Sequence, residues 1–284
     1  MNGFLVVDKP SGMTSHDVVA RVRRALGVRR VGHAGTLDPQ ATGILVVGVG
    51  RATRLLRFLE ATWKEYRAEV VFGVVTTTLD SEGEVVKQSD SSGLDAALVG
   101  EALGAFRGEV EQIPPMVSAV KVGGERLYRK ARRGEEVDRP ARRVVIDRLE
   151  LESFTPGSRA RAVLYVRCSK GTYVRSLAAD LGAALGPGAS LAALRRTRVG
   201  SFGLEDAVEL GAVDAGRLRP MEEAVAEYPR RTLESAEATA LLHGRPVAAA
   251  GVDGPWAAWG PAGLLAMMQD RGSEARSLCV VAEQ

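Results

Sequence analysis

The stretch GHAGTLDPQATG, residues 32–43, lies between two apolar segments and holds three glycines around an Asp-Pro pair. Glycine permits positive φ angles and a close approach of a ligand to the backbone. Pro39 confines Asp38 to extended conformations, which can hold the carboxylate outward. A catalytic or ligand-binding loop on a rigid scaffold commonly has this composition. An ordinary Asp-Pro turn or a helix N-cap is the alternative, and the loop's own residues leave both open.

The segments around this loop predict an α+β fold. Apolar residues run unbroken or alternate over strand lengths, and elsewhere recur every three to four residues over helix lengths. Strands are expected at 4–7, 44–49, 66–76, 144–154 and 160–168, and helices at 14–26, 53–59, 94–106 and 172–186. Because strands and helices do not alternate regularly, the pattern favours a mixed, largely antiparallel central sheet flanked by helices and loops.

Length and composition indicate one large and one small globular domain. The 284 residues are 45% hydrophobic and 26% charged, which provides enough apolar material for a sizeable core. From about Tyr228 lysine is absent, alanine, glycine and proline become frequent, and short apolar runs alternate with turns. We therefore expect a large domain over 1–225 and a small β-rich domain over 228–284.

Charge is unevenly distributed along the chain. Between Lys121 and Arg143, nine Lys and Arg residues accompany four Asp and Glu, a local charge of +5. After Pro220, five Arg accompany nine Asp and Glu, a local charge of −4. Such asymmetry indicates one part that faces a polyanion and a separate acidic part. A charged run can also be an ordinary solvated surface, so charge alone leaves nucleic-acid binding open.

Several classes of protein lack support in the sequence. The apolar runs, such as 43–49, are too short to cross a bilayer, and the first eight residues are expected to form a strand rather than a signal peptide. Cys168 and Cys279 lie far apart in apolar runs, which predicts reduced, structural thiols. The three histidines form no zinc-spaced cluster, and neither a P-loop nor a Gly-x-Ser-x-Gly pattern is present.

Five segments together resemble the bacterial TruB-type tRNA pseudouridine-55 synthases, in the order in which that family has them. They are 3–15, the 32–43 loop, Lys64–Glu65–Tyr66, the Pro114–Pro115 to Lys121 element, and 168–177 with 194–197. The chain departs from the family at Thr76–Thr77–Thr78, where the family has Thr-Asp-Thr, while Asp80 is retained. The segment after Tyr228 is loosely similar to the family's PUA-like domain.

The resemblance implies a pseudouridine synthase fold and the isomerisation of uridine 55 in the T loop of tRNA, with flipping of the target base. It assigns Asp38 as the catalytic nucleophile or base, Arg175 as its ionic partner, and Tyr66 as the residue beneath the base. Further substrate-binding residues are expected in the pocket, at the flipped nucleotide and along the basic segment: His33, Tyr173, Leu194, Lys9, Lys121, Arg126, Arg129, Lys130 and Arg132.

Pseudouridine formation detaches uracil from ribose, rotates it and rejoins it through carbon, so neither a cofactor nor a metal is expected. An aspartate, with a reference pKa of about 3.9, is already ionised at neutral pH and suits the role of nucleophile or base. Asp38 can either attack the sugar or the uracil ring, or remove the 2′-hydrogen of ribose to give a glycal. The sequence leaves these routes open.

The predicted partner is the T arm of tRNA, held by the basic segment at about 121–143. No membrane and no obligatory protein partner are expected, and the enzyme is predicted to be a cytoplasmic monomer. Two other classes remain: an RNA-binding or tRNA-folding module in which catalysis is secondary or lost, and a guide-RNA-dependent relative that works in a complex. The presence of Asp38, Tyr66 and Arg175 argues against lost catalysis, and the compact length favours a stand-alone enzyme.

Overall fold

The computed structural model describes residues 1–118, 121–127, 130, 133–135 and 137–282. Its contacts divide the chain into two compact units. The first unit consists of 1–39, 43–62 and 199–284, and the second of 40–42 and 63–198. The segment after Tyr228 therefore belongs to the same unit as the N-terminal strands, although it forms a sheet of its own.

The N-terminal sheet of the first unit holds four strands: β1 (Gly3–Lys9), β2 (Val31–His33), β3 (Thr42–Val49) and β14 (Val208–Glu209). β1 pairs antiparallel with β3 and parallel with β14, and β2 pairs antiparallel with β3. Helix α1 (Ser15–Leu26) packs its valines against residues of β1 and β3. The loop of residues 34–41 connects β2 directly to β3.

Helix α1 begins and ends where the sequence predicts. The Thr14 hydroxyl accepts a hydrogen bond from the Asp17 amide (3.1 Å), and the Asp17 carboxylate accepts one from the Thr14 amide (3.0 Å). This reciprocal capping box satisfies amides that the first turn leaves unpaired. Gly27 ends the helix at a φ of 64°, a left-handed conformation that glycine adopts without steric cost.

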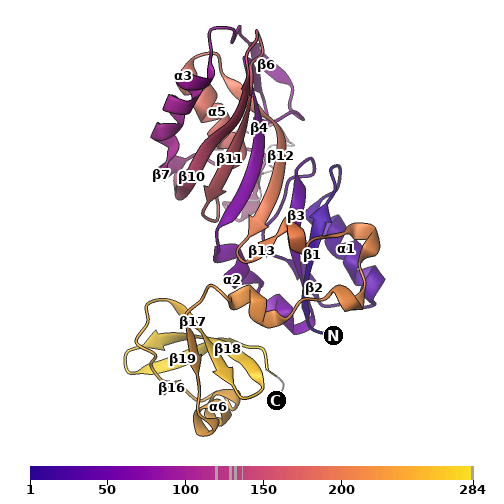
Figure 1. The fold of residues 1–284 in the computed structure, drawn as a ribbon, viewed down its shortest axis with the longest axis vertical. Helices are drawn as coiled ribbons and strands as arrows, with labels where there is room; N and C mark the ends of the chain where they lie inside the picture. The colour runs from indigo at the N-terminus through magenta and orange to yellow at the C-terminus, as the bar shows by residue number, and fades with distance from the viewer. Residues whose placement is uncertain (119–120, 128–129, 131–132, 136, 283–284) are drawn as a thin grey trace. The chain divides into compact units, whose positions relative to one another are not determined.

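The first unit also contains a small curled β sheet near its C-terminus (Figure 1). Its strand order is β15 (Arg230–Thr232), β17 (Pro255–Gly260), β18 (Gly263–Arg271), β19 (Glu274–Val280) and β16 (Val247–Ala248). Helix α6 (Ser235–Leu242) and the buried Trp256 contribute to its own hydrophobic cluster. The remaining elements of the unit are η1 (Gly50–Arg54), α2 (Leu56–Ala61), β13 (Phe202–Gly203), η3 (Leu204–Asp206), η4 (Leu210–Ala212), η5 (Ala215–Arg217) and η6 (Met221–Val225).

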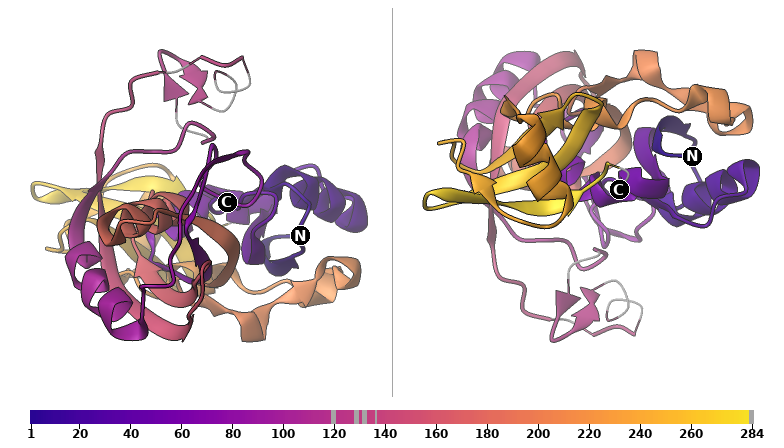
Figure 2. Two further views of the ribbon diagram at one scale, coloured as in Figure 1. Left: turned by 90° about the horizontal axis from the view of Figure 1, so that it is seen from above. Right: turned by 90° about the horizontal axis from the view of Figure 1, so that it is seen from below.

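The second unit is built on a largely antiparallel sheet. Its strand order is β12 (Ala189–Val199), β4 (Lys64–Phe72), β11 (Arg161–Cys168), β10 (Arg142–Thr155) and β7 (Gly108–Gln112). Helices α3 (Ala96–Ala102) and α5 (Val174–Leu185) lie beside these strands and share their hydrophobic core (Figure 1). The remaining elements are β5 (Val74–Thr76), β6 (Val85–Gln88), η2 (Leu103–Phe106), β8 (Lys121–Val122) and β9 (Glu125–Arg126). Figure 2 shows the β8–β9 hairpin standing away from the body of this unit.

The expected fold class is confirmed: strands and helices are mixed around largely antiparallel pairings, with a small β-rich C-terminal part. The expected hairpin is β10 with β11, and the expected helix over 172–186 is α5. Both cysteines are free thiols, and burial raises the pKa of the Cys168 thiol to about 11. Within the described residues, every helix is too short or too polar to cross a membrane.

Candidate active site

The loop between β2 and β3 is anchored on one side by the lysine that ends β1. Lys9 is fully buried, and its ammonium group donates hydrogen bonds to the carbonyl oxygens of Pro10 (2.9 Å), Met13 (2.6 Å) and Pro39 (2.9 Å). A buried charge needs such partners to offset the loss of hydration. Lys9 thus holds the residue that follows Asp38. Its predicted role in binding substrate stays a prediction.

A buried serine anchors the same loop from the other side. The Ser15 hydroxyl, at the first residue of α1, accepts a hydrogen bond from the Leu37 amide (2.9 Å) and donates one to the Leu37 carbonyl (3.2 Å). Ser15 is 1% exposed and Leu37 is 3% exposed. The capped end of α1 therefore fixes the residue that precedes Asp38. Sequence reasoning named Ser15 as a candidate helix cap and did not assign it this role.

Asp38 itself is half-buried between these two fixed neighbours, with Leu37 buried and Pro39 exposed. It is the only ionisable residue between His33 and Thr42. Because the backbone is held at both adjacent residues, the carboxylate has little freedom beyond its own side-chain torsions. Such a fixed, partly exposed carboxylate is suited to attack on, or proton removal from, a substrate placed against the loop.

His33 ends β2 in the same unit, and its ring meets a second histidine. The rings of His33 and His16 are 5.4 Å apart between centroids and nearly perpendicular, at 82°. His16 lies in the first turn of α1, one residue after Ser15. The start of α1 thus supports both His33 and the Asp38 loop, so two of the predicted site residues are positioned by one helix end.

In the second unit, Arg175 carries a buried guanidinium that contacts one carboxylate and two carbonyl oxygens of the same unit. It lies in the first turn of α5 with its side chain 5% exposed, and forms an ion pair with Asp80 (Nη1–Oδ2, 3.3 Å). It also donates hydrogen bonds to the carbonyl oxygens of Thr78 (3.2 Å) and Val117 (2.9 Å). The expected pairing with Asp38 stays a prediction. Asp80, noted in the sequence only as a retained residue, is the partner that sequence reasoning did not assign.

Three consecutive threonines, of which Thr77 departs from the family pattern, tie the Asp80 loop together. The Thr76 hydroxyl donates to the Asp80 carbonyl (2.7 Å), and the Thr78 hydroxyl donates to the Asp80 carboxylate. The Thr77 hydroxyl accepts from the amide of Glu84 (3.1 Å). Leu79, in the middle of this loop, has a φ of 64°, which a residue with a branched side chain adopts only when its surroundings hold it. The loop is therefore built to present Asp80 to Arg175.

The other predicted pocket residues of the second unit lie at the edge of its core. Tyr66 on β4 and Leu194 on β12 are partly buried against that core. Tyr173 precedes α5, and its backbone exchanges hydrogen bonds with the Gln112 side chain (2.9 and 3.3 Å). Partial burial leaves part of each side chain available for contact with a ligand, as a pocket lining requires.

The structure describes the basic segment only in part. Lys121 and Arg126 are paired residues of the β8–β9 hairpin, and Lys130 is half-buried. The predicted contacts Arg129 and Arg132 lie outside the described residues. Arg133 is neutralised by two carboxylates, with ion pairs of 2.8 Å to Glu125 and 2.7 Å to Glu135.

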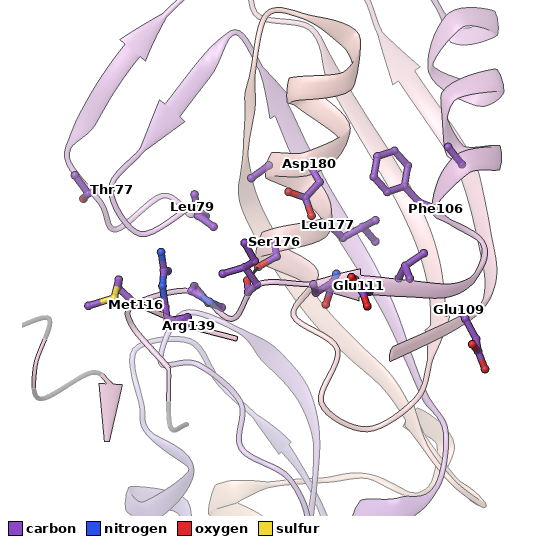
Figure 3. A pocket seen from close by; sticks show the side chains of 16 residues that line it. Thr77, Leu79, Phe106, Glu109, Glu111, Met116, Arg139, Ser176, Leu177 and Asp180 are labelled. Carbon is purple, nitrogen blue, oxygen red and sulfur yellow. Dashed lines mark hydrogen bonds between the residues drawn. The ribbon is translucent and has the colours of Figure 1, made fainter. Parts of the chain in front are cut away.

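A cavity of about 860 Å³ lies beside α5 in the second unit (Figure 3). Its lining includes Leu79, Met116 and Arg139, and Arg139 donates to the Pro114 carbonyl (3.0 Å). Tyr66 and Arg175 are not part of this lining, so the cavity is distinct from the predicted pocket residues. Among the described residues, no group of three or more His, Cys, Asp or Glu is placed to hold a metal ion.

Comparison with known families gives three matches along the chain. Residues 23–174 match the TruB family pseudouridylate synthase N-terminal domain. Residues 175–240 match the tRNA pseudouridylate synthase B C-terminal domain, and residues 228–282 match tRNA pseudouridine synthase II, C terminal. The chain belongs to the TruB family of pseudouridine synthases. The resemblance seen in the sequence and the expected enzyme class are thereby confirmed.

Relatives with assigned names are similar over most of the chain. tRNA pseudouridine synthase B of Mycobacterium sp. (strain KMS) is 50% identical over 98% of this chain and 96% of its own length. The protein of that name from Symbiobacterium thermophilum is 54% identical over 86% of this chain and 82% of its own length. The Thermobifida fusca protein of that name is 47% identical over 99% of both chains.

Solved structures of Cbf5 share the fold. A chain in the crystal structure of a Cbf5-Nop10-Gar1 complex has a TM-score of 0.77 and 26% identity, covering 99% of this chain and 85% of the other. A chain of the archaeal box H/ACA sRNP Nop10-Cbf5 complex has a TM-score of 0.74 and 26% identity, covering 99% and 86%. The likeness extends across both units of the enzyme.

Proposed function

We propose that this enzyme isomerises uridine 55 in the T loop of tRNA to pseudouridine, with Asp38 as the catalytic nucleophile or base. The observation that carries the proposal is the two-sided anchoring of the Asp38 loop. Ser15 holds Leu37 through both backbone groups, and Lys9 holds the Pro39 carbonyl. The relatives named tRNA pseudouridine synthase B support tRNA as the substrate.

The proposed reaction balances within one nucleotide. The bond between ribose C1′ and uracil N1 breaks, a bond between C1′ and C5 forms, the C5 hydrogen is released as a proton, and N1 gains one. No electrons are transferred to or from an outside group, so the chemistry requires no redox cofactor. An ionised Asp38 can serve by covalent attack on base or sugar, or by removing the 2′-hydrogen.

The remaining site residues take supporting roles in this proposal. Tyr66 stacks beneath the flipped uracil, Tyr173 and Leu194 line the pocket, and His33 positions the extruded nucleotide. Arg175, framed by Asp80 and the Thr78 carbonyl, supplies the positive charge that keeps Asp38 ionised and aimed. The cost of extruding a base is a few kcal/mol, which phosphate contacts from the basic segment at 121–143 offset.

Replacement of the carboxylate tests the proposal. Asp38→Asn and Asp38→Ala are expected to lower the rate of pseudouridine formation by at least about 10²–10⁴-fold, because the reacting group is lost. Release of tritium from C5-labelled uridine in a tRNA transcript measures the reaction, and a transcript with cytidine at position 55 tests the site. Asp253→Asn, a change at an exposed aspartate, is the matched control. Wild-type rates in Asp38→Asn would refute the role of Asp38.

A second arm of the test addresses partners. We propose that the enzyme acts as a cytoplasmic monomer on bare tRNA, without a guide RNA or an accessory protein. Purified protein is therefore expected to modify an unmodified transcript to completion, and size-exclusion chromatography is expected to give the mass of one chain. Dependence on an added protein or RNA would instead favour an enzyme that works within a complex.

A further inference from the structure

Exposed arginines are concentrated in the N-terminal part of the first unit. Between Arg21 and Arg57 the sequence has eight arginines, no lysine and a single acidic residue, Asp38, a local charge of +7. This exceeds the +5 of the segment at 121–143. Seven of the eight are exposed: Arg21, Arg23, Arg24, Arg29, Arg30, Arg54 and Arg57.

Hydrogen bonds tie the segments that carry several of these residues to one another. The Arg23 guanidinium donates to the Val31 carbonyl (2.8 Å), which joins the end of α1 to the start of β2. The Arg30 guanidinium donates to the Thr53 hydroxyl (2.8 Å), and the Gly50 amide donates to the Arg30 carbonyl (2.8 Å). These two hydrogen bonds join the residue before β2 to η1. We call Arg23, Arg24, Arg29 and Arg30, at the end of α1 and the entry to β2, the arginine surface.

Carboxylates do not neutralise the arginine surface. Within the part of the chain that the structure describes, none of its four guanidinium groups has an Asp or Glu oxygen within 4.0 Å. In the second unit, by contrast, Arg67, Arg148 and Arg167 each form an ion pair of 2.7–3.1 Å. The negative end of the α1 dipole favours positive charge at Arg23 and Arg24. Arg29 and Arg30 follow Gly27, so the helix dipole does not explain them.

The arginine surface lies away from the reacting group. Ser15, at the opposite end of α1, is the residue that holds Leu37 beside Asp38. Arg24 follows Ser15 by nine residue steps, which correspond to about 14 Å along the helix axis. A flipped nucleotide at Asp38 and a stem against the arginine surface can therefore belong to one folded RNA.

We propose that the arginine surface is a second RNA-binding site, which takes the sugar-phosphate backbone of a helical stem outside the T arm that carries the target uridine. The inference rests on the proposed function, since it concerns the same substrate RNA. Guanidinium groups bind phosphate oxygens in bidentate geometry and do so without reading the base sequence. The surface thus distinguishes a folded tRNA from an isolated stem-loop by size and shape.

A double variant, Arg24→Gln with Arg29→Gln, tests the proposal. Neither side chain makes a hydrogen bond to the protein in the described part of the structure, so the fold is expected to persist. With full-length tRNA, KM is expected to rise about 10-fold with kcat unchanged. The slope of the logarithm of the tRNA association constant against the logarithm of salt concentration is expected to become shallower by about 1.5, since each lost phosphate contact removes about 0.7–0.9. With an isolated T-arm stem-loop, both quantities are expected to stay at wild-type values.

The matched control removes two exposed arginines elsewhere in the same unit, Arg245→Gln with Arg276→Gln. An equal loss of tRNA binding in this control would show that the effect comes from the change in net charge alone, and it would overturn the proposal. Equal losses for stem-loop and full tRNA in the test variant would also overturn it, because the surface would then contact the T arm itself. If wild-type enzyme binds tRNA but forms no pseudouridine, the proposed function fails. The comparison of tRNA binding by the test and control variants still shows whether the arginine surface binds RNA.

Discussion

At the scale of single residues, the position of the Asp38 carboxylate depends on neighbouring residues that take no part in the proposed reaction. Leu37 and Pro39 are each held through backbone groups, by a hydroxyl and by an ammonium group respectively. A misplacement of about 1 Å at a reacting group can lower a rate by about 10²-fold. Residues that fix the loop are therefore expected to influence turnover without contacting the substrate.

Ser15→Ala is the sharpest change of this kind. It removes the hydroxyl that accepts the hydrogen bond of the buried Leu37 amide, and a buried unsatisfied group costs about 1–3 kcal/mol. We expect kcat to fall by about 10-fold with KM unchanged, because binding surfaces remain and the aim of Asp38 is lost. Steady-state kinetics and thermal unfolding measure the two effects separately.

Thr14→Ala is the matched control for Ser15→Ala. It removes the capping box from the same end of α1, at a cost of about 1 kcal/mol, and leaves the Leu37 contacts in place. A positioning role for Ser15 requires that the two variants lose similar stability while only Ser15→Ala loses kcat. Parallel losses of kcat in both variants would reduce Ser15 to a structural residue.

At the scale of elements, α5 shows how one glycine lets a helix meet a strand. A Cβ added to Gly182 would lie 2.2 Å from the Ala189 amide nitrogen and 2.4 Å from the Gly188 carbonyl carbon. The Gly188 amide also donates to the Gly182 carbonyl (2.9 Å). Because backbone atoms cannot move aside as a flexible side chain does, the end of α5 and the start of β12 require glycine at this position.

Paired alanine substitutions test this packing. Gly182→Ala is expected to lower the free energy of unfolding by about 1–3 kcal/mol or more, as overpacking of a buried site does. Gly100→Ala, within α3 and with open space around the added Cβ, is expected to raise it by about 0.5–1 kcal/mol. Urea denaturation measures both changes. A neutral Gly182→Ala would show that α5 can shift away from β12.

Element patterns in the sequence were sufficient for much of this architecture. The apolar stripe from Val174 to Leu185 predicts α5, and alternation over two segments predicts the pairing of β10 with β11. The Asp80–Arg175 ion pair could not be predicted in this way, because it joins residues far apart in sequence and depends on a φ of 64° at Leu79. Lys9 likewise resembles a surface lysine before a turn until three carbonyl oxygens are seen around it.

At the scale of the whole molecule, the C-terminal sheet is joined to the N-terminal part of the first unit by polar and apolar contacts. The Tyr228 hydroxyl donates to the Phe58 carbonyl (2.9 Å), and Arg57 donates to the Leu278 carbonyl (2.7 Å). Residues of β17 and β18 enter the same hydrophobic cluster as those of α2. Unfolding of the C-terminal sheet is therefore coupled to the scaffold that carries the Asp38 loop.

Asp270, on β18 of that C-terminal sheet, carries a carboxylate with four hydrogen-bond donors around it. Its carboxylate accepts hydrogen bonds from the Trp256 indole (2.8 Å) and from the amides of Ala250 (3.1 Å), Gly251 (2.7 Å) and Val252 (3.3 Å). Desolvation by itself raises the pKa of this carboxyl, but these hydrogen bonds outweigh it and leave the pKa below its ordinary value. A lowered pKa stabilises the folded state above the unfolded pKa and loses that contribution as pH falls through the folded pKa.

Asp270→Asn is accordingly expected to lower stability at neutral pH and to flatten the loss of stability on acidification below about pH 4, near the reference pKa of aspartate. In asparagine an NH2 group replaces one carboxylate oxygen and can only donate. It would therefore face N–H donors of the protein, and the asparagine could not accept hydrogen bonds from all four partners. Urea denaturation from pH 3 to pH 7, followed by tryptophan fluorescence, measures the effect, because Trp256 and Trp259 both lie in β17. Asp253→Asn, at an exposed position, is the control for loss of one negative charge. If the wild type and Asp270→Asn lose stability equally as the pH falls toward 3, titration of Asp270 does not govern the stability of the sheet.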